Sequence, residues 1–187
     1  MQNYFKKETP EKLVFERKIE DIPGGITVAV LDLTQKRIFA GTPVGPDQNG
    51  LYHVVKTARV REKVTTGTAY KVDKGHNFKV GDILAYNGVG YAISSINTTA
   101  AENDVITVAT SLGEVEAGEI VFEGNKSAAS AVVFKYVPSA LVGTTMDIIE
   151  GDNHLTDGVV RGSVREAAIG AAISAEIKKA LPLIRFV

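Results

Sequence analysis

Hydrophobic and polar residues alternate with a period of two along short stretches of the chain. In residues 26–31, Ile26, Val28 and Val30 fall on one face of an extended backbone, as a half-buried strand requires. Residues 37–40, 51–55 and 58–60 are further candidates for short strands. Residues 41–46, Gly-Thr-Pro-Val-Gly-Pro, have the composition of a turn. The first part of the chain is therefore predicted to consist of strands separated by turns.

A second series of short strands occupies residues 62–124. Asn87-Gly88 and Ser111-Leu112-Gly113 supply turn signals between the strands. Short strands at nearly regular spacing are typical of a small barrel or sandwich. We therefore predict an inserted small β-barrel with strands at 69–72, 83–86, 91–96, 104–108 and 119–122.

The chain then returns to the first unit through small and polar residues at 124–130. Strand-like segments at 131–137, 146–149 and 159–164 would complete the sheet that residues 26–60 begin. The predicted fold class is mainly β, with a β-sandwich or barrel-like core, the inserted small β-barrel and a short C-terminal helix. The predicted organisation is an arm at 1–24, a core formed by 25–61 and 125–187, and the insertion at 62–124.

Residues 165–181 change to helix-forming composition. Ile169, Ile173 and Ile177 repeat every four residues, which predicts an amphipathic helix that Pro182 ends. The apolar tail at 183–187 is expected to dock. The isoleucine stripe can either cover the chain's own core or contact another subunit. The candidate capsid or subunit contacts come from the arm, this stripe and the tail, and they are Phe5, Phe15, Ile169, Ile173, Ile177, Ile184 and Phe186.

Charge and composition narrow the classes of partner. Lysine and arginine number 21 against 22 aspartate and glutamate, so no basic field exists that would favour nucleic acid or an anionic membrane. No apolar run approaches the length of a membrane span, and the N-terminus lacks a signal-peptide core. The absence of cysteine excludes disulfides and thiol chemistry, and fits synthesis in a reducing cytoplasm.

The three histidines are the first candidates for acid–base chemistry, because only histidine titrates near neutrality without assistance. His53, His76 and His154 lack a recognisable catalytic partner motif, so a structural role is favoured for each. Asp147, Glu150, Asp152 and Asp157 do not have the spacing of a calcium loop. We predict no enzyme activity, catalytic residue, cofactor or metal.

Three turn-rich motifs carry a resemblance to a known class. Ala40-Gly41-Thr42-Pro43-Val44-Gly45, Leu141-Val142-Gly143-Thr144-Thr145-Met146 and Leu155-Thr156-Asp157-Gly158-Val159-Val160-Arg161-Gly162 lie between short strands. The outer unit, residues 26–60 and 131–165, thereby resembles the head-decoration and head-fibre-base proteins of tailed bacteriophages. The insertion at 62–124 departs from the simplest decoration proteins.

The resemblance implies a structural virion protein, made in the bacterial cytoplasm, that binds the outer capsid surface and stabilises or decorates it. Its implied partners are the major capsid protein and further copies of itself, with a trimer as one candidate oligomer. The first alternative is a carbohydrate- or host-surface-binding β module. Exposed aromatic side chains would be expected in such a module, and the chain has no tryptophan. The second is a small β-barrel enzyme, which would need some of His53, His76, Asp82 and His154 to converge in a pocket.

Overall fold

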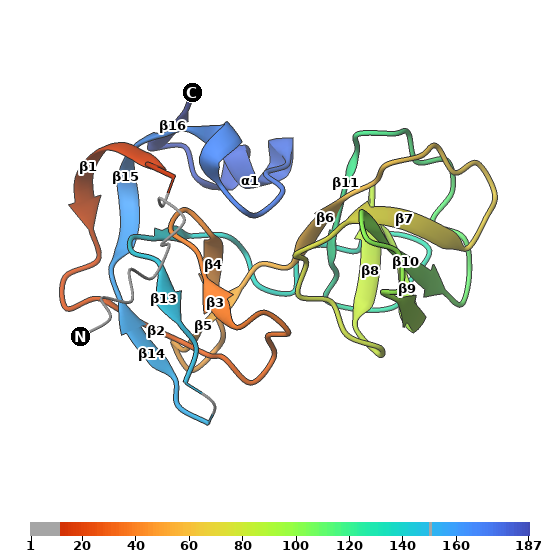
Figure 1. The fold of residues 1–187 in the computed structure, drawn as a ribbon, viewed down its shortest axis with the longest axis horizontal. Coiled ribbons are helices and arrows are strands. Elements are labelled where there is room, and N and C mark those ends of the chain that lie inside the picture. The colour runs from red at the N-terminus through yellow and green to blue at the C-terminus, as the bar shows by residue number, and fades with distance from the viewer. Residues whose placement is uncertain (1–11, 150) are drawn as a thin grey trace, which may run out of the picture.

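The chain folds into two β units that lie side by side (Figure 1). A computed structural model describes residues 12–149 and 151–187. Strands account for 42% of the structure and helix for 5%, so the predicted mainly β class with a short C-terminal helix is confirmed. The sheets curl into half-barrels. None of the helices in the described residues is long and apolar enough to span a membrane.

The larger unit is built on an eight-stranded sheet. Its strand order is β1-β15-β12-β4-β5-β2-β14, and β16 pairs with β15 in parallel. The first and last strands of the described residues, β1 and β16, both belong to this sheet (Figure 1). Its strands are β1 (Phe15–Asp21), β2 (Ile26–Val28), β4 (Pro43–Pro46), β5 (Tyr52–Val54), β12 (Ala140–Val142), β14 (His154–Thr156), β15 (Gly158–Val164) and β16 (Ile184–Phe186).

The smaller unit is a six-stranded antiparallel sheet with the order β6-β11-β8-β9-β10-β7. A bridge between Val60 and Val72 connects its two outer strands, and Arg61 N donates to Lys71 O at 2.8 Å. The sheet therefore curls until its edges meet. Its strands are β6 (Thr57–Arg59), β7 (Ala69–Asp73), β8 (Ile83–Tyr86), β9 (Val89–Asn97), β10 (Asn103–Val108) and β11 (Ile120–Glu123).

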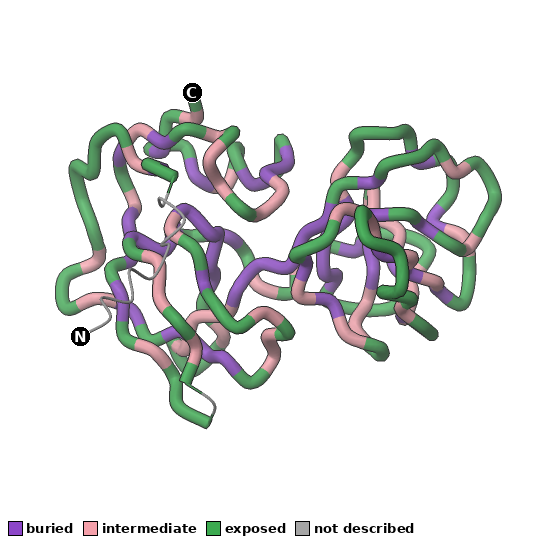
Figure 2. The backbone as a smooth tube through the Cα atoms, in the orientation of Figure 1, coloured by how far each residue is buried: buried purple, intermediate pink, exposed green. Residues whose placement is uncertain are grey.

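Each unit buries its own apolar core, as the purple segments within both units show in Figure 2. The smaller core contains the fully buried Tyr70, Phe78 and Leu84. A separate pair of strands, β3 (Arg37–Ile38) and β13 (Met146–Asp147), packs Ile38 into the larger unit. At about 25 cal/mol per Å² of apolar surface, such burial is the main source of stability in both units.

Several segments differ from the sequence-based expectation. Residues 15–21, assigned to an arm, form the edge strand β1 because their backbone pairs with β15. Residues 43–46, interpreted as a turn, form β4 inside the sheet. Residues 131–137 form no strand, since Ala131 takes a left-handed φ of 56° and Phe134 makes only an isolated bridge to Gly124. Ala128 bridges to Gly90, so the expected linker at 124–130 lies against the smaller unit.

The C-terminal helix is shorter than the predicted span of 165–181. A 3-10 turn (η1, Glu166–Ala168) and the helix α1 (Ala175–Ala180) are separated by a segment without helix. Gly170 lies in this segment, and glycine weakens a helix interior. Ser174 accepts a hydrogen bond from Ile177 N and so fixes the start of α1. Lys178 and Lys179 fall in the last turn, where cations interact favourably with the helix C-terminus.

Candidate functional site

The two units meet at a buried cluster of charges. Lys56 lies between β5 and β6, where the chain crosses from the larger unit to the smaller one, and this crossing is purple in Figure 2. Its Nζ atom lies 2.8 Å from Asp82 Oδ2 and 3.6 Å from Glu123 Oε1. Only 2% of the Lys56 side chain is exposed. A buried ammonium requires such partners, because leaving water without them is costly.

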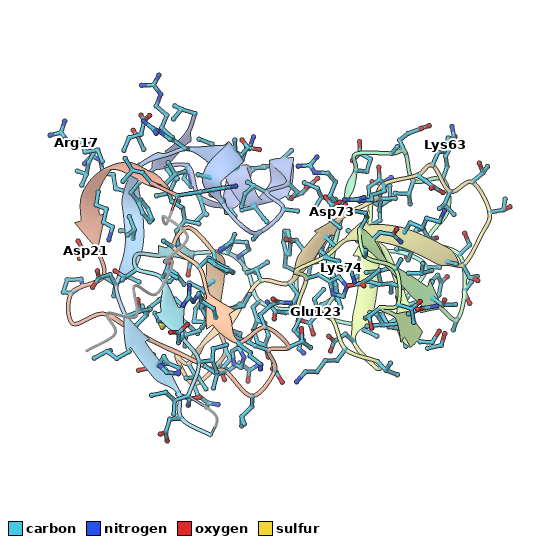
Figure 3. The ribbon with its side chains drawn as sticks, in the orientation of Figure 1. Arg17, Asp21, Lys63, Asp73, Lys74 and Glu123 are labelled. Carbon is cyan, nitrogen blue, oxygen red and sulfur yellow. The ribbon has the colours of Figure 1, made fainter. Side chains whose placement is uncertain are left out.

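Glu123 joins a third segment to this cluster. It ends β11, and Figure 3 shows it between the two units. Its Oε1 atom accepts from Lys135 Nζ at 2.7 Å, while its backbone pairs with Lys56 O and Lys135 N. Burial raises the pKa of the Glu123 carboxyl, although Lys135 and Lys56 lower it. Glu123 therefore contacts both segments that connect the units, one at Lys56 and the other at Lys135.

A second set of contacts ties the loop after β2 to the smaller unit. Asn77 Oδ1 accepts from Thr34 N at 3.0 Å and from Gln35 N at 3.1 Å. Lys79 Nζ donates to Leu31 O at 2.8 Å, and Thr57 Oγ1 donates to Ala172 O at 2.8 Å. These contacts lie apart from the cluster of Lys56, Asp82, Glu123 and Lys135, which is called here the joint.

His53 lies beside the joint in a stacked arrangement. Its ring is parallel to that of Tyr136, with centroids 4.0 Å apart. Nδ1 lies 3.7 Å from Asp32 Oδ2, and Nε2 lies 3.5 Å from Asp47 Oδ2. Burial alone would raise the pKa of Asp47, but the backbone amides of Asn49 and Leu51, together with His53, hold it below its usual value. The stacked tyrosine ring holds this imidazole, and neither of its nitrogens makes a hydrogen bond to the described residues.

His76 is held inside the smaller unit. Its Nδ1 atom accepts from Phe78 N at 3.2 Å, so the ring proton belongs on Nε2, which lies 3.3 Å from Asp104 Oδ2. Lys74 Nζ donates to the other oxygen of Asp104 at 2.6 Å. Burial lowers the pKa of His76, although Asp104 raises it. The acceptor nitrogen of this imidazole is therefore already engaged within the smaller unit.

The remaining candidates for catalysis have separate partners. His154 Nε2 accepts from Ile149 N at 2.9 Å, at the start of β14. Asp82 pairs with Lys56 and also accepts from Lys79 N at 2.8 Å. Among the described residues, no hydrogen bond or ion pair joins any two of His53, His76, Asp82 and His154. The convergence that the enzyme alternative requires is not found in these contacts.

The acidic loop considered for calcium is also occupied by internal contacts. Asp147 pairs with Arg37 at 2.6 Å, and Asp157 lies 3.8 Å from Lys18. Glu150 lies outside the described residues. Within the described ranges, no group of three histidine, cysteine or acidic side chains could hold a metal ion.

The candidate contact residues are mostly part of the larger unit's own core. Ile173, Ile177 and Ile184 are buried there, and the other three described candidates, Phe15, Ile169 and Phe186, pack against the same cluster. Phe5 lies outside the described residues. The isoleucine stripe thus covers the chain's own core, and its buried members offer no surface to another subunit.

The sequence reasoning missed the charged joint. Lys56 stands between Val55 and Thr57 in a run of buried residues, and Glu123 ends the apolar strand Ile120–Glu123. A charge inside a strongly apolar run was the available signal, because such a residue must find a buried partner. The sequence suggests a role for Asp82 only in the enzyme alternative, and it places Lys135 in a predicted strand.

A cleft of about 330 Å³ lies between the units. Its lining includes the buried Lys56 and Thr57 and also Phe39, which has 46% of its surface exposed. Charged side chains also line it, including Arg37, Arg59, Asp73 and Lys74. The cleft is a polar recess with one aromatic wall.

Comparison with known proteins gives no relative: no protein-family model, curated protein or solved structure matches this chain.

Proposed function

We propose that this chain is a structural virion protein, without catalytic activity, that binds the outer surface of a tailed-phage capsid and stabilises or decorates it. The observation that carries the proposal is the joint of Lys56, Asp82, Glu123 and Lys135. It fixes two β units in one geometry, and a binding protein with fixed geometry loses little conformational entropy when it docks. The bacteriophage assignment itself rests on the turn motifs of the larger unit.

Exposed aliphatic side chains beside the joint are the proposed capsid contact. Leu31, Val80 and Val137 are 74%, 63% and 60% exposed. Leu31 O accepts from Lys79, next to Val80. Asp32 and Tyr136, the neighbours of Leu31 and Val137, both pack on His53. The three side chains, called here the joint patch, therefore flank one region and replace the buried isoleucines as the expected contact.

Many copies on one shell would stabilise it by mass action, since each bound copy favours the intact surface. The test is sedimentation of the purified full chain with purified shells that lack it. We expect saturable binding, and a loss of about tenfold or more in affinity for Leu31→Ser/Val80→Ser/Val137→Ser. Leu155→Ser is the control, because Leu155 is 71% exposed on β14, at the edge of the larger sheet. Equal binding by the triple variant would contradict the joint patch, and no binding by the native chain would contradict the function.

The cleft favours one second candidate, a carbohydrate- or host-surface-binding module. Phe39 could stack on a sugar ring, and Arg59 and Asp73 could bond to its hydroxyl groups. A thermal-shift survey with simple saccharides tests this candidate. A rise in melting temperature that Phe39→Ala abolishes would favour it over a purely structural role.

A further inference from the structure

The outer edge of the larger sheet carries a distinctive order of charges. β1 pairs with β15 on one side, and no strand of the described residues pairs with its other side. Figure 1 shows β1 at the border of the larger unit that faces away from the smaller unit. An edge strand presents unpaired backbone donors and acceptors to any strand that can approach.

The residues of this edge read Arg17-Lys18-Ile19-Glu20-Asp21, two cations and two anions on either side of one isoleucine. All five are exposed, and Ile19 is 53% exposed. Arg17, Glu20 and Asp21 have no ion-pair partner among the described residues, while Lys18 has only Asp157 at 3.8 Å. Figure 3 shows Arg17 and Asp21 along this outer edge.

When two copies of this segment run in opposite directions, each cation of one copy lies opposite an anion of the other. We propose that β1 pairs antiparallel with β1 of a second copy of this chain, with Ile19 opposite Ile19 of the second copy. Arg17 then faces Asp21 of the second copy and Lys18 faces Glu20, and the two-fold symmetry repeats each pair. Opposite charges that face each other across strands are favourable, and a symmetric contact of this kind closes as a dimer.

Other arrangements of the same edge are worse. Parallel pairing in register places each charge opposite an identical charge. A slip of one residue in one direction brings Glu16 opposite Asp21, two anions, and leaves Ile19 opposite Lys18. A slip in the other direction places Ile19 opposite Glu20. The charge order therefore selects both the orientation and the register.

The irregular pairing of β1 supports selectivity. Its register against β15 shifts at three places, between Phe15 and Arg17, between Lys18 and Glu20, and between Glu20 and Asp21. Such irregularities discourage indiscriminate edge pairing. A strand that pairs with β1 must therefore also carry complementary charges, and β1 of a second copy does so. The contact is small, so a dissociation constant on the order of 10–100 µM is expected.

The inference is independent of the proposed capsid function. It proposes a two-fold dimer as the self-associated state, whereas the resemblance suggests a trimer as one candidate. It can be measured on the purified full chain without any shell, so its failure and that of the capsid proposal are distinguishable.

Sedimentation equilibrium of a pair of charge variants tests the contact. Glu20→Lys/Asp21→Lys makes the edge wholly cationic, and Arg17→Glu/Lys18→Glu makes it wholly anionic. We expect each variant alone to weaken dimerisation about tenfold or more, and an equimolar mixture to form a heterodimer at least as well as the native chain. High salt should weaken the native dimer.

A matched control separates this contact from net charge. Glu102→Lys/Asp152→Lys changes the net charge by the same amount as the cationic variant, at exposed positions without an ion-pair partner among the described residues. It should dimerise like the native chain. A native chain that stays monomeric to about millimolar concentration would overturn the proposal. So would a dimer that ignores both edge variants, or a mixture that fails to form the heterodimer.

Discussion

Lys56 Nζ lies 2.8 Å from Asp82 Oδ2 at the crossing between the two units, where only 2% of the lysine side chain is exposed. A lysine on a long flexible stem does not usually stay buried. Here Asp82 and Glu123 compensate its charge, and in return it compensates theirs. These charged side chains therefore act together with the contacts of Asn77, Lys79 and Thr57 in holding the two units.

Loss of the cation should be costly. Lys56→Met keeps the length of the side chain but leaves two carboxylates without their shared partner. We expect a fall of about 3–5 kcal/mol in the free energy of unfolding, measured by urea denaturation near neutral pH. Lys126→Met, at an exposed position, is the control and should change stability by less than about 0.5 kcal/mol. Similar stabilities for the two variants would show that the joint contributes little.

Stability should depend on pH through His76. Burial holds its pKa below the usual value, so the unfolded chain binds the proton more readily than the folded chain. The contribution of His76 is therefore complete above about pH 6.5 and is lost as the pH falls through that value toward the lowered pKa. His76→Gln removes this group. Between about pH 7.5 and pH 5, the free energy of unfolding should fall further for the native chain than for the variant. The difference is about 1.4 kcal/mol for each pH unit by which burial lowers the pKa of His76. Parallel pH profiles would contradict this assignment.

Gly45 is expected to tolerate no side chain. It lies in β4, and a Cβ atom there would collide with the backbone carbonyl of Val137. Gly45→Ala must push the two backbones apart, at a cost of about 1–3 kcal/mol. Thermal unfolding measures this, with Gly50→Ser as the control, because nothing lies within 4 Å of a Cβ at Gly50. Serine at Gly50 would only meet the strain of a left-handed φ of 83°. If Gly45→Ala proves no more destabilising than that control, the close approach of β4 to Val137 is wrong.

Local pattern was sufficient for much of the fold. The regular spacing of short strand-like segments between turn signals predicted β7 and β10 at residues 69–72 and 104–108. The Asn87-Gly88 pair marked the tight turn between β8 and β9, where Asn87 takes a φ of 47°. Such signals act over a few residues and can be read from the sequence directly.

Other elements depend on contacts between distant residues. Pro43–Pro46 has a turn-like composition, yet it becomes β4 because β5 and β12 supply partners on both sides. The helix-forming composition of 165–174 is overridden by packing: Ile169 lies against Gly41, and Phe39 against Gly170. The joint escaped prediction for the same reason, since Lys56, Asp82 and Glu123 are far apart in sequence.

Quantitative mass spectrometry of tailed-phage particles purified from the cells that produce this chain tests the central claim, the proposed capsid function, most directly. The copy number of the chain is compared with that of the major shell protein in the same particles. A capsid-surface protein predicts a ratio of order one or a small simple fraction of it. Absence of the chain from purified particles would contradict the proposed function and leave the cleft as the first place to seek another.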